Sequence, residues 1–170
     1  MRFFIATQQQ LLRIISHSIS GFDTPVSHLG IKECIVSIES LKEVYDLTIA
    51  NSIKRKNPEL DNEFRSNIVK AISYIMSNLD FDAFDRYTFI RDCLNPITRN
   101  WKEIRDLSGL WTNVDNKPFN FDAPTFFENG SFNINYFAPP TDRNPSNEKI
   151  AFGKKLFLNQ NWPEMAIWPV

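Results

Sequence analysis

The sequence predicts an all-α fold, a bundle of about four helices followed by an irregular aromatic-rich arm and a short final helix. Apolar residues recur at steps of three and four over four long segments, as expected for helices with one buried face. Hydrophobic residues make up 42% of the 170-residue chain, which is enough for one ordinary core. We therefore expect helices over residues 3–20, 31–56, 58–79 and 83–107.

The first two helices are predicted mainly from their apolar stripes. In 3–20 the buried face includes Leu11, Ile14 and Ile15, and Gly21 supplies a C-terminal stop. Residues 31–56 carry the most regular stripe of the chain, formed by Ile31, Cys34, Ile35, Ile38, Leu41, Tyr45, Thr48, Ile49 and Ser52. This regularity predicts one uninterrupted helix.

A start signal precedes the third helix. Asn57 can cap it, Pro58 suits its first position, and Glu59 places an acid in its first turn. The residues that we expect this helix to bury are Leu60, Phe64, Ile68, Ala71, Ile72, Ile75 and Leu79.

The fourth helix follows a cluster of aspartates. We expect Asp82 to cap it, with Asp80 and Asp85 adding negative charge at the positive end of the helix. Pro96 interrupts the pattern and predicts a kink between Asp92 and Pro96, where Asn95 would pair with a freed backbone group. The expected apolar stripe consists of Tyr87, Ile90, Leu94, Ile97, Trp101 and Ile104.

Beyond residue 107 the periodicity is lost. The organisation that we expect is a bundle over 1–107, an arm over 108–146, a short helix over 147–158 and a tail over 159–170. Docking of the arm's many aromatic residues on the helices is the favoured interpretation, with disorder as the alternative. A short helical turn is expected at 124–129, and Ser146 or Asn147 should cap the final helix.

Charge and composition limit the function. The net charge is −1, which argues against a sequence-independent nucleic-acid binder. No segment is long and apolar enough to span a membrane, and the first ten residues do not resemble a signal peptide. Cys34 and Cys93 fall in apolar helical patterns, so two buried free thiols are favoured over a disulfide.

No catalytic or metal site can be assembled from the residues. Asp80, Asp82 and Asp85 could bind calcium, but their spacing is not that of a calcium loop and helix capping explains them. His17 and His28 are the only histidines, and neither has a second histidine at ligand spacing. The C-x-x-C-H motif of covalent haem attachment is absent.

Large aromatic residues in the arm and tail are the candidate interaction surface, because such residues dominate interface energetics. The residues proposed for this surface are Phe126, Phe127, Tyr136, Phe137, Trp162 and Trp168. We expect Phe126, Phe127, Tyr136 and Phe137 to be partly exposed, which would also favour self-association.

Three segments resemble bacterial di-haem cytochrome c peroxidase or MauG-like proteins that carry an extra helical domain before their haem domains. The segments are residues 10–25, 80–96 and 147–157. The last one reads NEKIAFGKKLF and is similar to the N-x-x-[KR]-[IV]-A-L-G-[KR]-x-L-F run that opens the first haem domain of the family. The family continues with F-D-x-R-L-S and then C-x-x-C-H, whereas here Leu158, Asn159 and Gln160 follow.

The resemblance implies a fragment of a larger periplasmic or cell-envelope protein. Its parent would carry two covalent c-type haems and oxidise c-type electron donors with peroxide. This chain would be a non-catalytic accessory domain without a cofactor of its own, and its partners would be the parent's haem domains or another protein surface. No catalytic residue can be transferred to any position here.

Two other functions remain open. The chain could be a stand-alone helical module that binds a protein through its arm and tail. It could also bind haem non-covalently and act as an oxidoreductase, for which the axial-ligand candidates are His17, His28, Met1, Met76 and Met165.

Overall fold

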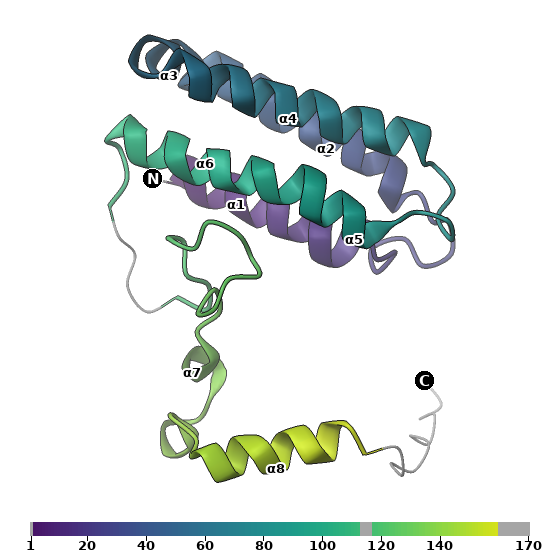
Figure 1. The fold of residues 1–170 in the computed structure, drawn as a ribbon, viewed down its shortest axis with the longest axis vertical. Helices are drawn as coiled ribbons and strands as arrows, with labels where there is room; N and C mark the ends of the chain where they lie inside the picture. Colours follow the sequence, from purple (N-terminus) through teal and green to yellow (C-terminus); the bar gives the residue numbers. More distant parts are fainter. Residues whose placement is uncertain (1, 113–116, 160–170) are drawn as a thin grey trace. The chain divides into compact units, whose positions relative to one another are not determined.

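The computed structural model describes residues 2–112 and 117–159, and it confirms the all-α class (Figure 1). Within these residues, pairing of extended segments is limited to one isolated antiparallel bridge between Phe119 and Phe132. The chain divides into two compact units, Met1–Phe132 and Asn133–Val170. The first part of the expected arm therefore belongs to the helical bundle.

Four helical segments build the first unit. They are α1 (Arg2–Arg13) with the π turn η1 (Ile14–Ser18), α2 (Gly30–Thr48) with α3 (Ala50–Lys56), α4 (Pro58–Ser77), and α5 (Arg86–Phe89) with the π turn η2 (Ile90–Leu94) and α6 (Asn95–Ser108). Helix α4 packs on both α2 and α6, and α1 packs on α6 (Figure 1). None of the helices in the described residues is long and apolar enough to cross a membrane.

The centre of the bundle is aromatic. The Trp101 ring lies with its centroid 5.6 Å from that of Phe4 and 6.0 Å from that of Phe64, so one side chain joins α1, α4 and α6. All three side chains are buried. Such pairs contribute about 1 kcal/mol each beyond the burial of their area.

Several local predictions are confirmed. The Asn57 side chain accepts a 3.0 Å hydrogen bond from the Leu60 N–H at the start of α4, with Pro58 in the first turn. Gly21 adopts the positive φ of +78° expected after a helix end.

The single helix expected over 31–56 was wrong. The structure has two helices there, separated at Ile49, where φ is −113°. The Thr48 hydroxyl donates a 2.6 Å hydrogen bond back to the Val44 carbonyl. Such back-bonding by threonine competes with the helix ladder and bends helices.

The start of the fourth helix was wrongly assigned to Asp82. Asp85 is the N-cap, and its side chain accepts from the Thr88 N–H, so α5 begins at Arg86. Asp80 accepts from the N–H groups of Asp82 and Ala83, which closes a turn before the helix. Leu79 and Tyr87, both expected in buried stripes, are exposed.

The loop at 117–132 docks on the bundle as expected, because Phe119 and Phe126 are buried in its core. The helical turn predicted at 124–129 is not formed. Thr125 Oγ1 accepts the Phe127 N–H instead, which makes a tight non-helical turn.

The second unit contains α7 (Ile134–Phe137), the 3₁₀ turn η3 (Pro140–Asp142) and α8 (Asn147–Phe157). Asn135 and Asn144 exchange two hydrogen bonds of 2.7 and 2.9 Å, which close the loop between α7 and α8. Ser146 caps α8 by accepting the Lys149 N–H, as predicted.

Candidate interaction surface

One exposed aromatic residue of the predicted surface lies in a shallow hollow of the first unit. Phe127 is 60% exposed and borders this hollow together with Tyr87, Ile90, Arg91 and Asn95, which we call the Phe127 patch. Its members come from α5, η2, the first residue of α6 and the loop at 117–132. Because all of these elements belong to one compact unit, the patch is a fixed feature of the bundle.

A π turn places Arg91 and Asn95 in the patch. The Asn95 N–H donates to the Ile90 carbonyl five residues earlier, and Pro96, which follows, has no N–H to donate. The irregularity expected between Asp92 and Pro96 is therefore a π turn that begins at Ile90. The pairing expected of Asn95 was wrong, because its buried Oδ1 has no hydrogen-bond partner among the described residues.

Arginine and aromatic side chains dominate the patch. The Arg91 guanidinium lies 5.2 Å from the centre of the Tyr87 ring, and its Nε lies 2.6 Å from Asp92 Oδ1. Hydrogen bonding from Arg91 holds the pKa of Asp92 below its usual value. Tyr and Arg are among the residue types enriched in the energetic centres of protein interfaces, and Phe is enriched in interfaces generally.

Sequence reasoning missed Tyr87 and Arg91 as surface residues. Tyr87 was assigned to the buried stripe, yet it is 71% exposed. The spacing of Tyr87 and Arg91 is i, i+4, at which a cation can lie over a ring on one helix face. The i, i+4 spacing was therefore the available signal for a surface pair. Tyr87 also fits the apolar period of the helix, which predicts burial equally well.

The second unit exposes a further aromatic pair. The rings of Tyr136 and Phe137 meet edge to face with centroids 5.0 Å apart, and both side chains are exposed, as is Ile134. These two aromatic residues of the predicted surface are therefore accessible within their own unit.

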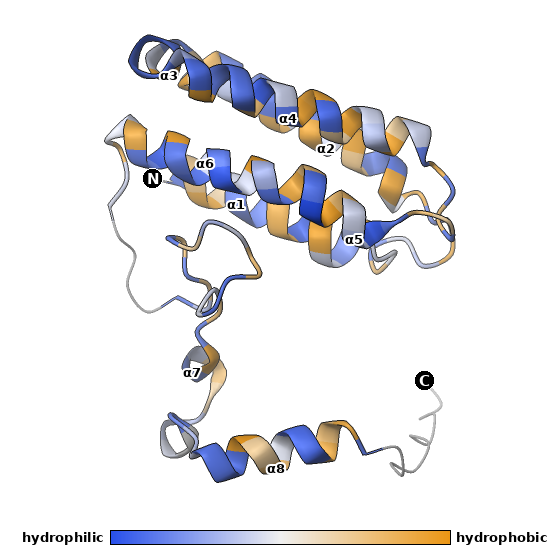
Figure 2. Ribbon diagram, in the orientation of Figure 1, coloured by the Kyte–Doolittle hydropathy of each residue, from blue (hydrophilic) through white to orange (hydrophobic). Residues whose placement is uncertain are grey.

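Helix α8 also carries uncovered apolar residues. Every side chain of Asn147–Phe157 is exposed, and Phe157 is 87% exposed. Figure 2 shows apolar and charged stretches alternating along this helix. Phe152 and Leu156 are four residues apart, as are Gly153 and Phe157, which gives α8 an apolar side that none of the described residues of its unit covers.

The other three residues of the predicted surface are not seen as exposed side chains. The prediction that Phe126 belongs to the surface was wrong, because Phe126 is only 3% exposed. It packs in the core, with its ring centroid 5.1 Å from that of Phe119. Trp162 and Trp168 lie outside the described residues.

The histidines and methionines do not form a ligand site among the described residues. His17 Nδ1 lies 2.6 Å from the Ser16 hydroxyl, and His28 stacks on Phe81 with a centroid distance of 4.2 Å. Met76 is exposed on α4, whereas Met1 and Met165 lie outside the described residues. No group of three or more His, Cys, Asp or Glu side chains that could hold a metal ion occurs in the described part of the chain.

The aspartates and cysteines have structural explanations. Asp85 caps a helix, and the Thr88 N–H that it accepts lowers its pKa. Cys34 and Cys93 are free and buried, as favoured from the sequence. Burial raises the pKa of the Cys34 thiol to about 12 and also raises that of Cys93, so neither provides a reactive thiolate at neutral pH.

Comparison with known proteins identifies no relative: no family model, no curated protein and no solved structure matches this chain.

Proposed function

We propose that this chain is a non-catalytic accessory and interaction domain of a MauG-like di-haem cytochrome c peroxidase of the cell envelope. One observation carries the proposal. Helix α8, which has the sequence that resembles the opening of a haem domain, is a capped helix whose side chains are all exposed. A helix with uncovered apolar residues is expected where a further domain or a partner completes the packing.

The other two resembling segments support a structural rather than a chemical role. They meet at one corner of the bundle, where Arg86 Nε donates a 2.7 Å hydrogen bond to the Ile19 carbonyl. The same guanidinium donates to the Phe81 carbonyl at 2.8 Å and lies 4.4 Å from the centre of the Phe81 ring. A Cβ on Gly21 would come within 2.6 Å of that ring. These residues hold the end of α1 against the turn before α5.

Energetics also favour a partner for α8. A helix of 11 residues is marginally stable in water without tertiary packing. Burying a large side chain such as Phe152 or Phe157 contributes about 2 kcal/mol each. Docking of α8 on a haem domain would therefore stabilise the helix and bind the two parts together, while peroxide chemistry would belong to the haem domains.

The coding sequence downstream of Val170 tests this proposal. A C-x-x-C-H motif within some tens of codons, in the same or a shifted reading frame, is the expected result. The absence of such a motif from all three forward reading frames of this region would contradict the proposal.

A second candidate function is a stand-alone protein-binding module. The Phe127 patch favours it, because it presents arginine and aromatic side chains on a bundle whose core is formed within one unit. Crosslinking of the purified chain in a lysate of its source organism, with Arg91→Ala as the altered protein and Arg99→Ala as the matched control, tests this candidate. Loss of one specific adduct with Arg91→Ala alone would support the module, and identical adducts in both would contradict it.

A further inference from the structure

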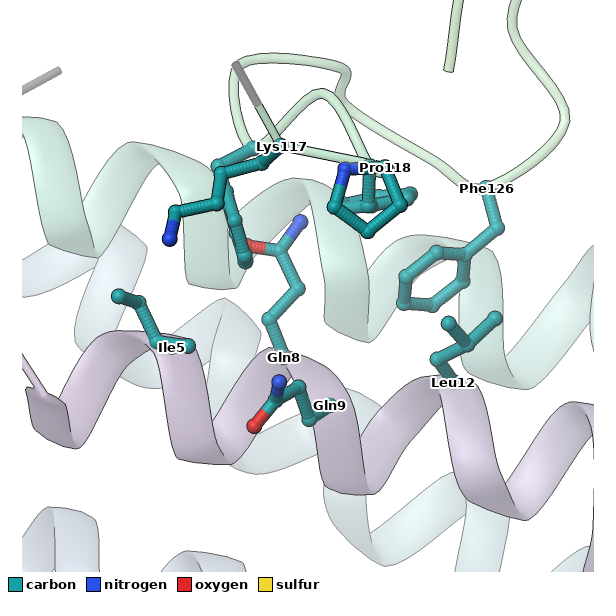
Figure 3. A pocket seen from close by; sticks show the side chains of 9 residues that line it. Ile5, Gln8, Gln9, Leu12, Lys117, Pro118 and Phe126 are labelled. Atoms are coloured by element: carbon teal, nitrogen blue, oxygen red, sulfur yellow. The ribbon is translucent and has the colours of Figure 1, made fainter. Parts of the chain in front are cut away.

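A pocket lies between α1 and the loop at 117–126 in the first unit (Figure 3). Its volume is about 220 Å³. Ile5, Gln8, Gln9 and Leu12 form its floor on successive turns of α1, and loop residues that include Lys117 and Phe126 cover it. Cavities of about 150 Å³ can hold a benzene molecule, so this one has room for a single ring with a short substituent.

Gln8 is a largely buried polar residue of this pocket whose side chain has no hydrogen bond among the described residues. It is only 7% exposed. Figure 3 shows the side chain rising from α1 to end between Lys117 and Pro118. The amide atoms are not among the fully enclosed, unpartnered polar atoms of the described residues, so they keep access to solvent through the pocket. A ligand in the pocket can therefore reach this amide and hydrogen-bond it.

The two ends of the pocket differ in chemistry. Lys117 and Gln8 both line the pocket, and in Figure 3 the Lys117 side chain starts above the Gln8 amide and ends on the Ile5 side of it, with the exposed Gln9 amide below. Leu12 and Phe126 face each other at the other end. Lys117 is exposed, and no ion pair joins it to a carboxylate of the described residues.

We propose that this pocket binds a small aromatic monocarboxylate. The ring would pack between Leu12 and Phe126, and the carboxylate would accept hydrogen bonds from the Gln8 amide and from Lys117. Apolar walls with a few convergent polar groups are typical of small-molecule sites. Because the pocket lies wholly in the first unit, this binding does not depend on the function proposed for α8.

Phenylacetate is the probe for the test, followed through the methyl signals of Ile5 and Leu12 in NMR titrations of the full chain. We expect saturable shifts of these methyl groups. Gln8→Met keeps the size of the side chain and removes its amide, so it should weaken binding about fivefold. Lys117→Met removes the exposed charge and should weaken binding by a similar factor. Lys54→Met, an exposed lysine on α3, is the control and should leave binding unchanged.

Ethylbenzene, which has a similar ring but no carboxylate, separates the proposal from simple apolar filling. Weaker binding of ethylbenzene than of phenylacetate would support the proposal. Equal or tighter binding of ethylbenzene, or phenylacetate affinity that survives Lys117→Met, would overturn it, as would the absence of methyl shifts up to the solubility limit. Lys117→Met decides the outcome even if Gln8→Met fails to fold, since Lys117 is exposed and outside the core.

Discussion

Arg105 on α6 donates a 2.8 Å hydrogen bond from Nη2 to Asp122 Oδ1 in the loop at 117–132. The same side chain is 1% exposed, donates to the Phe121 carbonyl, and lies 4.4 Å from the centre of the Trp111 ring. One guanidinium therefore fixes the loop that covers the pocket and carries Phe127. Its planar set of five donors allows several carbonyl and carboxylate contacts at once.

Replacing Arg105 by methionine should release this loop. The carbonyl of Phe121 and the carboxylate of Asp122 lose their shared donor, and we expect a loss of about 3 kcal/mol in the free energy of unfolding. Hydrogen–deuterium exchange should accelerate most at the Asn120 N–H, which donates to the Ser131 carbonyl inside the loop. Arg99→Met, on the exposed side of α6, is the control, and equal exchange in the two variants would contradict this role of Arg105.

Asp106 should make stability depend on acid pH. Partial burial raises its pKa, but hydrogen bonds from Lys102 at 2.7 Å and from Arg105 outweigh that effect and hold the pKa below the ordinary 3.8. The charged form is thus favoured in the folded state. Its contribution to stability is complete above pH 3.8 and is lost as the pH falls through the lower folded pKa.

Urea unfolding of Asp106→Asn at several pH values measures this contribution. The variant should be less stable than the parent at pH 6, and the difference should shrink toward zero near pH 2. Asp82→Asn, in the exposed turn before α5, should show no such convergence. A difference that stays constant from pH 6 to pH 2 would mean that the charge of Asp106 does not stabilise the fold.

The contact between α2 and α4 depends on a buried polar pair. The Tyr45 hydroxyl donates a 2.7 Å hydrogen bond to Asp61 Oδ1, and Arg65 Nε also donates to that carboxylate. Tyr45→Phe should lower the free energy of unfolding by about 2 kcal/mol, because a hydrogen bond to a charged acceptor is lost. Tyr136→Phe, at an exposed ring in the second unit, should change it by less than about 0.5 kcal/mol. Similar decreases in the free energy of unfolding in both variants would show that the Tyr45–Asp61 hydrogen bond does not stabilise the contact.

Local sequence signals predicted a helix boundary correctly where only one residue could serve as the cap. Asn57 followed by Pro58 defines the start of α4 without any tertiary information, and the structure confirms it. Asp80, Asp82 and Asp85 are all suitable caps, so the choice of Asp85 depends on which turn precedes it. The interruption at Ile49 depends on the rotamer of Thr48, which no periodicity reports.

The candidate sites were harder to predict because they join distant segments. Phe126 and Phe127 are neighbours in a loop without a period, and only the tertiary contacts decide that one is buried and the other exposed. Gln8 shares a helix face with Phe4 and Leu11, so a polar residue in an apolar stripe was visible. The pocket around Gln8 could not be predicted in this way, because Lys117 and Phe126 are more than a hundred residues away in the sequence.

The uncovered apolar residues of α8 should cause the isolated chain to self-associate. Sedimentation velocity at increasing protein concentration should show a rising average mass. The double variant Phe152→Ser with Phe157→Ser should reduce this rise, because it removes two exposed rings from α8. Val69→Ser, at an exposed position on α4, is the control. A parent chain that remains monomeric at high concentration would contradict the expectation.

The proposed partnership with covalent haem domains can be tested on the native protein. We would immunoprecipitate this chain from the source organism and stain the precipitate for haem in a denaturing gel. We expect a haem-stained band, either in the polypeptide that the antibody detects or in one that accompanies it. A precipitate that contains the antigen but no haem-stained band would rule out the partnership.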